Sequence, residues 1–399
     1  MFSCIFPKFR FLFCIVFWLI HSVLHAQFLD EFDRGQVEPW FYFTGDGEVR
    51  MEFVPHDGFA RIGIDAREDR HNVWWSIIKR NIAEEVDLAQ LQQSGYELRV
   101  QARIRLSHAP RRINFMINTQ RTTDFHEHLA EFDIADAQTW HTISYTTRGL
   151  DVMPGDSLYV QLGVTDWGGA QYEVDIDSYR ADVVKLSETP PDVGEPLIYH
   201  APVPPLTSFS QSLSASQCAL IRQDFPEVNF SDWHWSGPDG TFPLLSVNGA
   251  QWLVVRWDVS RLTSPLVESL GVLELRLHSH ASGGRYVDAY GEDLGIEFGK
   301  LRVIEILNAD PRWKRDSVTY DSLTQGLPYE QVFNEQMTYD VDLATDEREY
   351  LRLTLSRPVM QRLLDGTTQG LLIRPLGAVS ANFFPADVDA PKLYFHLKE

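Results

Sequence analysis

A two-residue alternation of apolar and polar side chains is the feature that most constrains how this chain can fold. In Tyr96–Leu106 apolar residues occupy the even positions and polar residues the odd ones, and the same period returns in residues 158–164 and 172–176. Successive side chains of a β-strand point to opposite faces, so this pattern predicts strands with one buried face. Within residues 27–186, helical periodicity is confined to residues 83–91. Short strands separated by Gly- and Pro-containing turns predict an antiparallel β-sandwich over residues 27–186.

The first 26 residues have the pattern of a secretory signal. Lys8 and Arg10 precede the apolar run Phe11–Ile20, and Val23–Ala26 offers a cleavage site before Gln27. The apolar run is shorter than the ~20 residues that cross a bilayer as a helix. We therefore expect residues 1–26 to be a cleaved signal peptide, the protein to be secreted or periplasmic, and no segment to span a membrane.

The charge and the cysteine content of the chain limit the partners and the disulfides that we expect. The formal net charge is −21, and so acidic a surface argues against nucleic acid as a partner. An anionic substrate stays open, because arginines can be concentrated locally in one groove. Cleavage of the signal would remove Cys4 and Cys14, which leaves Cys218 alone and rules out an intramolecular disulfide. The sequence gives no indication of oligomeric state.

A Pro-rich segment at residues 187–207 predicts a stiff, extended connector between two domains. The second domain, residues 208–399, is again expected to be mostly β. Its apolar strand-like runs are residues 252–257, 272–277, 301–306, 350–355 and 370–374. Only Pro358–Leu364 has a helical pattern, with Pro in the first turn and Gly366 just past the end. The predicted fold class is therefore all-β, with two jelly-roll-like β-sandwiches.

The first domain resembles carbohydrate-binding modules of the family four and nine type, which are β-jelly rolls. The segments that carry the resemblance are Asp30–Gly35, Trp40, Tyr96–Leu106, Trp140–Tyr145, Leu158–Leu162 and Tyr172–Asp177. The resemblance implies a structural calcium ion between the first and last strands, for which Asp30, Asp33 and Asp177 are the expected oxygen ligands. Solvated acidic residues at strand ends are the alternative interpretation.

The second domain resembles DNRLRE-type β-sandwich modules over residues 210–398. These modules occur on secreted proteins that act on polysaccharides, and some bind acidic algal glycans. The matching segments are Leu253–Asp258, Val267–Leu275, Trp313 with Ser317–Tyr320, Val359–Gly366 with Gly370–Arg374, and Pro391–Phe395. The resemblance implies binding or packing rather than chemistry.

The stretch from Arg111 to Tyr145 is unusually dense in Arg, His, Glu and Tyr and is the predicted site. We expect three short strands there, with His126 and His128 on one face because they lie two residues apart. β-Elimination from a uronic acid needs a cation to neutralise the carboxylate, a base and an acid. The predicted catalytic residues are His126, His128, Tyr145 and Arg121. The predicted substrate-binding residues are Arg111, Arg112, Asn114, Asn118, Glu127, His141, Trp74 and Trp167.

Three alternatives remain open for this stretch. His126, His128 and His141 could instead hold zinc, and His141 and Tyr145 could be core residues because they share the parity of Ile143. The parity of the histidine strand is itself undecided: burial of Phe125 and Leu129 would expose the two histidines, whereas burial of Phe132 and Ile134 would bury them. A β-bulge between residues 129 and 132 would reconcile the two patterns.

Two functions follow as hypotheses. The first is an exported lyase or dehydratase that needs no cofactor and acts by β-elimination on a uronic acid-containing polysaccharide such as ulvan or alginate. The second is a non-catalytic protein with two carbohydrate-binding modules that binds acidic polysaccharide. Motifs for a nucleophilic serine or cysteine and for a phosphate-binding loop are missing from the sequence.

Overall fold

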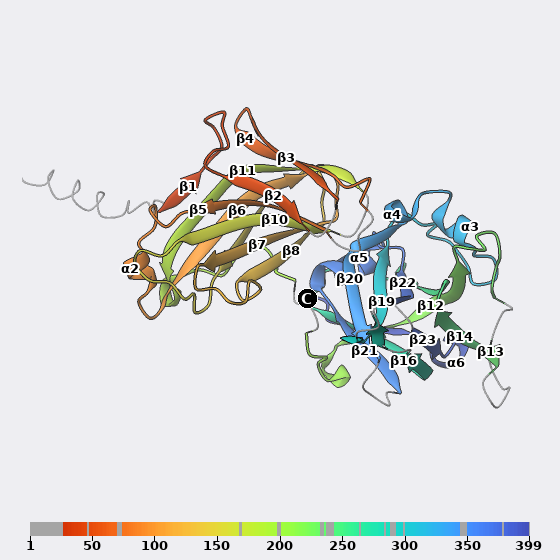
Figure 1. Ribbon diagram of the computed structural model, residues 1–399. Coiled ribbons are helices and arrows are strands. Elements are labelled where there is room, and N and C mark those ends of the chain that lie inside the picture. Colours follow the sequence, from red (N-terminus) through yellow and green to blue (C-terminus); the bar gives the residue numbers. More distant parts are fainter. Residues whose placement is uncertain are drawn as a thin grey trace, which may run out of the picture.

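Two packed β-sheets form the first half of the protein in the computed structural model (Figure 1). The structure describes residues 27–45, 48–69, 74–166, 170–197, 201–231, 235–236, 243–262, 265–282, 285–287, 293–297, 300–343, 349–376 and 379–398. The predicted signal peptide and Trp167 lie outside these residues. The predicted fold class, an all-β protein built of sandwiches, is confirmed.

The first sandwich pairs a six-stranded sheet with a five-stranded one, and every described strand pairing in it is antiparallel. The six-stranded sheet contains β3 (Arg50–His56), β4 (Phe59–Asp65), β11 (Gln171–Lys185), β6 (Tyr96–Leu106) and β9 (Trp140–Thr146), with β1 (Phe28–Asp30) also paired to β11. The five-stranded sheet runs in the order β2 (Phe41–Gly45), β5 (Trp74–Asn81), β10 (Leu158–Asp166), β7 (Arg111–Thr119), β8 (Leu129–Ile134). One helical turn, α2 (Leu88–Leu91), lies within the predicted helical segment.

The alternation in the sequence determines which side chains fill this sandwich. Val100 and Ile104 of β6 are fully buried, as are Val160 of β10 and Phe115 of β7. Burying one such side chain stabilises the fold by about 1.5–3 kcal/mol. Their polar neighbours on each strand therefore face outward, on the far side of one sheet or the other.

In the described residues, the second sandwich is built from an eleven-stranded sheet that folds over its own core. Its strands are β12 (Gln211–Arg222), β13 (Trp235–Ser236), β14 (Pro243–Asn248), β15 (Gln251–Trp257), β16 (Gly271–Ser282), β19 (Lys300–Ile306), β20 (Phe333–Asp342), β21 (Tyr350–Leu355), β22 (Leu371–Leu376), β23 (Val379–Phe383) and β24 (Lys392–Phe395). A separate hairpin pairs β17 (Arg285–Val287) with β18 (Asp293–Glu297). The helices are α3 (Tyr320–Thr324), α4 (Tyr329–Val332), α5 (Arg357–Asp365) and α6 (Ala386–Asp389).

Helix α5 forms where the sequence predicts it. Pro358 lies in its first turn, and Gly366 ends it in the left-handed conformation with φ +82°, which glycine adopts without a steric penalty. Its buried face includes Met360 and Leu363. No helix in the described part of the chain is long and apolar enough to cross a membrane. Cys218 is buried and unpaired, and burial raises the pKa of its thiol to about 12.

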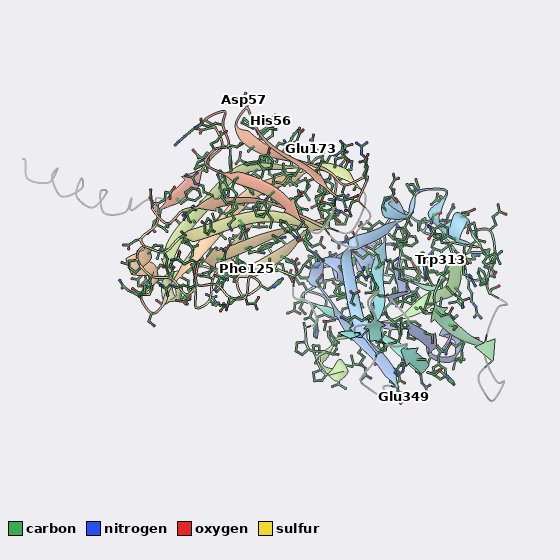
Figure 2. The ribbon with its side chains drawn as sticks, in the orientation of Figure 1. His56, Asp57, Phe125, Glu173, Trp313 and Glu349 are labelled. Carbon is green, nitrogen blue, oxygen red and sulfur yellow. The ribbon has the colours of Figure 1, made fainter. Side chains whose placement is uncertain are left out.

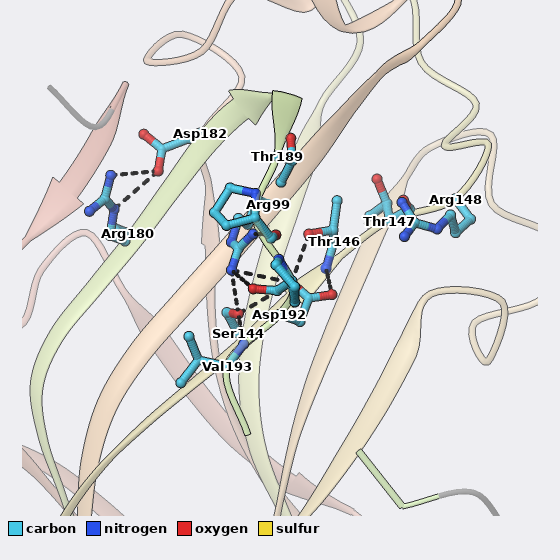
Figure 3. Close-up of polar contacts among 12 residues, drawn as sticks. Arg99, Ser144, Thr146, Thr147, Arg148, Arg180, Asp182, Thr189, Asp192 and Val193 are labelled. Carbon is cyan, nitrogen blue, oxygen red and sulfur yellow. Dashed lines mark hydrogen bonds and ion pairs between the residues drawn. The ribbon is translucent and has the colours of Figure 1, made fainter. Parts of the chain in front are cut away.

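The Pro-rich segment is extended, but its first half is not a free connector. Asp192 accepts hydrogen bonds from the backbone N–H and the hydroxyl of Thr146, at 3.2 and 2.8 Å (Figure 3). The Val193 N–H donates to the Ser144 hydroxyl at 2.6 Å, and the Leu197 N–H donates to the Glu131 carbonyl at 2.6 Å. Residues 189–197 thus pack along the first sandwich.

The second sandwich lies against one end of the five-stranded sheet. Strand β20 contacts β7 and β10, and Glu195 of the Pro-rich segment pairs with Arg357 of α5. Asp133 at the end of β8 pairs with Arg362 of α5 at 2.6 Å. The junction therefore joins residues of both sandwiches directly, beyond the covalent connection.

Candidate functional site

The outer face of the five-stranded sheet, the side away from the core, carries aromatic, amide and charged side chains. Strand register arranges these side chains in rows that cross the sheet. From the end nearest the second sandwich, the first row is Gly45, Trp75, Thr165, Arg112 and Asp133, and the second is Phe43, Ile77, Gly163, Asn114 and Glu131. The third row is Phe41, Lys79, Gln161, Met116 and Leu129, and the fourth is Asn81, Tyr159 and Asn118.

Aromatic rings gather at the β2 edge of this outer face. Phe41 and Phe43 are stacked with ring centroids 6.1 Å apart, and Phe43 meets Trp75 edge-on at 5.4 Å. The indole of Trp75 lies directly over Gly45, where a Cβ would overlap the ring. Phe41 and Phe43 are 48% and 37% exposed. Adjacent exposed aromatics on an edge strand are costly in water and point to a ligand or partner.

Amide side chains are fixed in the centre of the outer face. The Gln161 Nε2 donates to Asn118 Oδ1 at 2.6 Å, and the Asn114 Nδ2 donates to Thr165 Oγ1 at 2.9 Å. Gly163 lies between them, and a Cβ there would come within 2.7 Å of the Asn114 Oδ1. Both amides are buried, with Gln161 3% and Asn118 5% exposed, so they form the floor of the outer face.

Charged groups on the outer face are few. The Lys79 ammonium lies 4.3 Å from the centre of the Tyr159 ring, and burial lowers the pKa of Lys79. Arg112 is 2% exposed and approaches Glu131 at 4.0 Å. The face therefore combines apolar rings and oriented amides, with Lys79 between them and the Arg112–Glu131 contact toward β8.

The first row ends in a buried ion cluster shared with the second sandwich. The Arg362 guanidinium donates to both oxygens of Glu305 at 3.0 and 2.7 Å, and Glu305 also accepts from Thr368 at 2.7 Å. Burial raises the pKa of Asp133. Burial opposes the charge of Arg362, but Glu305 and Asp133 together raise its pKa above the usual value. The second sandwich thus covers the Asp133 corner of the outer face.

The prediction that His126 and His128 share one face of a strand is wrong. The chain turns through residues 125–128, and β8 begins only at Leu129. The His126 ring is exposed, with its Nδ1 3.3 Å from the Asp124 carboxylate. His128 is 2% exposed, and burial lowers its pKa. Phe125, labelled in Figure 2, is 51% exposed. The two burial patterns predicted for residues 125–134 are therefore reconciled by a turn before Leu129 and not by a β-bulge.

The other two predicted catalytic residues lie elsewhere. Tyr145 and His141 point with Ile143 toward the inside of the sandwich from β9, and burial raises the pKa of Tyr145 to about 12. Arg121 lies in the loop after β7 and pairs with Asp156 at 2.6 Å. The carboxylates of Glu97 and Glu127 act on the pKa of both His128 and Tyr145. Glu127 itself is exposed in the turn.

The predicted substrate-binding residues divide between two faces. Alternation along β7 places Arg112, Asn114 and Asn118 on the outer face. Arg111 points inward instead, 4.3 Å from the Tyr172 ring and 3.8 Å from Asp166. Trp74 is fully buried in the core, so its prediction as a ligand contact is wrong and its neighbour Trp75 occupies the outer face.

The three predicted calcium ligands are not brought together. Asp30 accepts from Trp40 at 2.8 Å and from Arg80 at 3.1 Å, and Asp177 pairs with Arg103 at 2.8 Å. Across the described residues, no group of three or more His, Cys, Asp or Glu side chains is placed to hold a metal ion, which applies to the zinc alternative as well. Arg80 and Arg103 pair with Asp30 and Asp177, two of the carboxylates that were predicted to bind calcium.

Several outer-face residues are missing from the sequence prediction: Phe41, Phe43, Trp75, Lys79, Tyr159, Gln161 and Glu131. The polar positions between Leu158 and Val164 could have identified Tyr159 and Gln161, because they alternate with core residues. A cavity of about 660 Å³ on the opposite sheet is lined by charged residues, among them Arg50, Glu52 and Glu173. It has none of the exposed rings found on the outer face.

Comparisons with known proteins add fold-level likeness only. No family model and no curated protein matches the chain. Among solved structures, TmCBM61 in complex with β-1,4-galactotriose is 12% identical, with 39% of this chain and 94% of that chain covered and a TM-score of 0.27. The CBM22-1 xylan-binding domain of Paenibacillus barcinonensis Xyn10C is 15% identical, with 40% and 96% covered and a TM-score of 0.27. The tandem CBM22-1–CBM22-2 domain of the same protein is 11% identical, with 93% and 95% covered and a TM-score of 0.27.

These likenesses are too distant to carry an argument about this chain, whose sandwich architecture is given by its own strand pairings. The similarity of the second sandwich to DNRLRE-type modules stays a prediction.

Proposed function

We propose that the protein binds a glycan chain on the outer face of the five-stranded sheet. A sugar ring presents apolar C–H groups on its faces and hydroxyls at its edge. The outer face offers the complement of both: exposed rings at Phe41 and Phe43 for stacking, and partly exposed side chains at Tyr159 and Thr165, whose hydroxyls can bind sugar hydroxyls.

The observation that carries the proposal is the placement of stacked, exposed rings on one sheet beside the partly exposed Tyr159 and Thr165. Phe43 and Trp75 hold each other edge-on, and Gly45 leaves the room that Trp75 occupies. A ligand that covers these rings would recover the cost of their exposure. A preorganised face loses little side-chain entropy on binding, which favours affinity. The expected export signal agrees with this function, since structural polysaccharides lie outside the cell.

Affinity gel electrophoresis against a panel of soluble neutral and acidic polysaccharides tests the proposal. The wild type should be retarded by at least one of them. Phe43→Ala should weaken that retardation by about five- to thirtyfold in affinity, the effect of losing one important contact. Phe225→Ala is the matched control, because Phe225 is 50% exposed but lies in the second sandwich. Equal loss in both variants, or in neither, would contradict the assignment to the outer face.

Elimination chemistry remains the alternative and is less well supported. It depends on His126, His128, Tyr145 and Arg121 acting on one substrate, whereas Arg121 and His126 lie on loops and Tyr145 points into the sandwich. A lyase or dehydratase would release an unsaturated uronate that absorbs ultraviolet light. Appearance of that absorbance with ulvan, alginate or glucuronan fragments would favour the enzyme, and its loss in His128→Ala but not in His126→Ala would identify the base.

A further inference from the structure

Lys79 is a cation on β5 beside the aromatic edge of the outer face, and it has no carboxylate partner among the described residues. It lies in the third row, between Phe41 on β2 and Gln161 on β10. Glu131 carries the nearest carboxylate in the second and third rows, but it lies on β8, three strands from the β5 strand of Lys79. At ~4.8 Å between neighbouring strands, the two backbones are about 14 Å apart. Glu131 approaches Arg112 instead.

The environment of Lys79 favours an anion at its ammonium group. The side chain is partly buried, and loss of water there disfavours its charged form. The Tyr159 ring lies 4.3 Å away and compensates in part through its π-face. A bound carboxylate or sulfate would supply the missing counterion and a charge-assisted hydrogen bond.

We propose that the glycan bound on the outer face carries an anionic group, a carboxylate or a sulfate ester, and that Lys79 is the residue that recognises it. This inference rests on the proposed function. A sugar ring bound beside Tyr159 would present its substituent to the Lys79 ammonium. Because the whole chain has a formal charge of −21, long-range attraction cannot select a polyanion. Selection must come from contact with a local cation.

The test compares three oligosaccharide probes by calorimetric titration: a uronic acid oligomer, the same oligomer after chemical reduction of its carboxyls, and a sulfated oligomer. The wild type should prefer at least one anionic probe over the reduced one by about tenfold to hundredfold, the range of a charged hydrogen bond. Lys79→Met keeps the aliphatic stem, removes the charge and should abolish the preference, while binding of the reduced probe persists. Lys79→Gln serves as a second variant should Met perturb folding.

Lys185→Met is the matched control, because it makes the same change of charge at an exposed pair with Glu188 and should keep the preference. A preference for the uronic acid oligomer identifies the anion as a carboxylate, and a preference for the sulfated oligomer identifies it as a sulfate ester. Equal binding of anionic and reduced probes by the wild type, or an undiminished preference in Lys79→Met, overturns the inference and leaves glycan binding intact. Failure of every probe and polysaccharide to bind overturns the proposed function and this inference with it.

Discussion

Asp133 of the first sandwich and Arg362 of the second form an ion pair of 2.6 Å, with both side chains almost completely removed from solvent. Glu305 shares the same guanidinium. Two domains joined only by a connector would not bury charges between them, since desolvation costs several kcal/mol per ion. The pair therefore indicates that the two sandwiches dock in one defined arrangement, with the second covering one corner of the outer face.

Replacement of Arg362 should be severely destabilising. Arg362→Met leaves Asp133 and Glu305 buried without the guanidinium that they share, and loss of one partner of a buried pair costs about 3–5 kcal/mol. Asp133→Asn should cost less, because Glu305 still pairs with Arg362. Urea unfolding measures both. Lys185→Met, at an exposed pair, should change stability by no more than about 1 kcal/mol. An Arg362→Met protein as stable as the wild type would show that the buried pair does not hold the junction.

The first half of the Pro-rich segment should resist proteases. Asp192 binds Thr146 and Ser144, and the segment carries backbone hydrogen bonds to β9 and β8. We expect no early cleavage within residues 189–197 of the wild type, and new cleavage there in Asp192→Ala. Limited proteolysis with mass spectrometry of the fragments measures this. Rapid cutting of the wild type inside this stretch would mean that it is a free connector after all.

His128 should make stability depend on pH. Burial lowers the pKa of its imidazole below the unfolded value of ~6.5. Between the two pKa values the unfolded chain binds more protons than the folded one, so stability falls as pH falls through ~6.5. His128→Leu should flatten this dependence in thermal melts recorded from pH 7.5 to 5. His126→Leu should not, because His126 is exposed; the opposite ranking would refute the placement of the two rings.

A methyl group added at Gly45 should weaken glycan binding at the aromatic rings of the β2 edge. Gly45→Ala would push the Trp75 ring off its position, since the new Cβ overlaps it. We expect glycan affinity to fall at least about fivefold, as for loss of an important contact, while the sandwich stays folded. Gly63→Ala is the control: Gly63 lies on β4, and its Cβ would meet nothing closer than 3.9 Å. Calorimetric titration together with circular dichroism separates lost binding from lost fold.

The sequence predicted the strands better than the site, and particular residues show why. Alternation in Tyr96–Leu106 predicted β6 to the residue, because one face is wholly apolar and the other wholly polar. The run from Trp74 to Ile78 has apolar residues on both faces, so the sequence did not decide which tryptophan faces outward and the wrong one was chosen. The prediction that His126 and His128 share one face of a strand was wrong because a turn, not a strand, precedes Leu129. The contact of Asp133 with Arg362 depends on how two sandwiches dock, which no local pattern contains.

Hydroxyl-radical footprinting of aromatic side chains is the most direct test of where the glycan binds. The wild type is labelled with and without a bound polysaccharide, and a polysaccharide that does not bind controls for radical scavenging. If the glycan binds the outer face, Phe41, Phe43 and Trp75 lose labelling on binding, while Phe59 and Trp140, on the outer side of the six-stranded sheet, keep theirs. Protection of Phe59 and Trp140 with unchanged labelling at Phe41, Phe43 and Trp75 would contradict binding at the outer face.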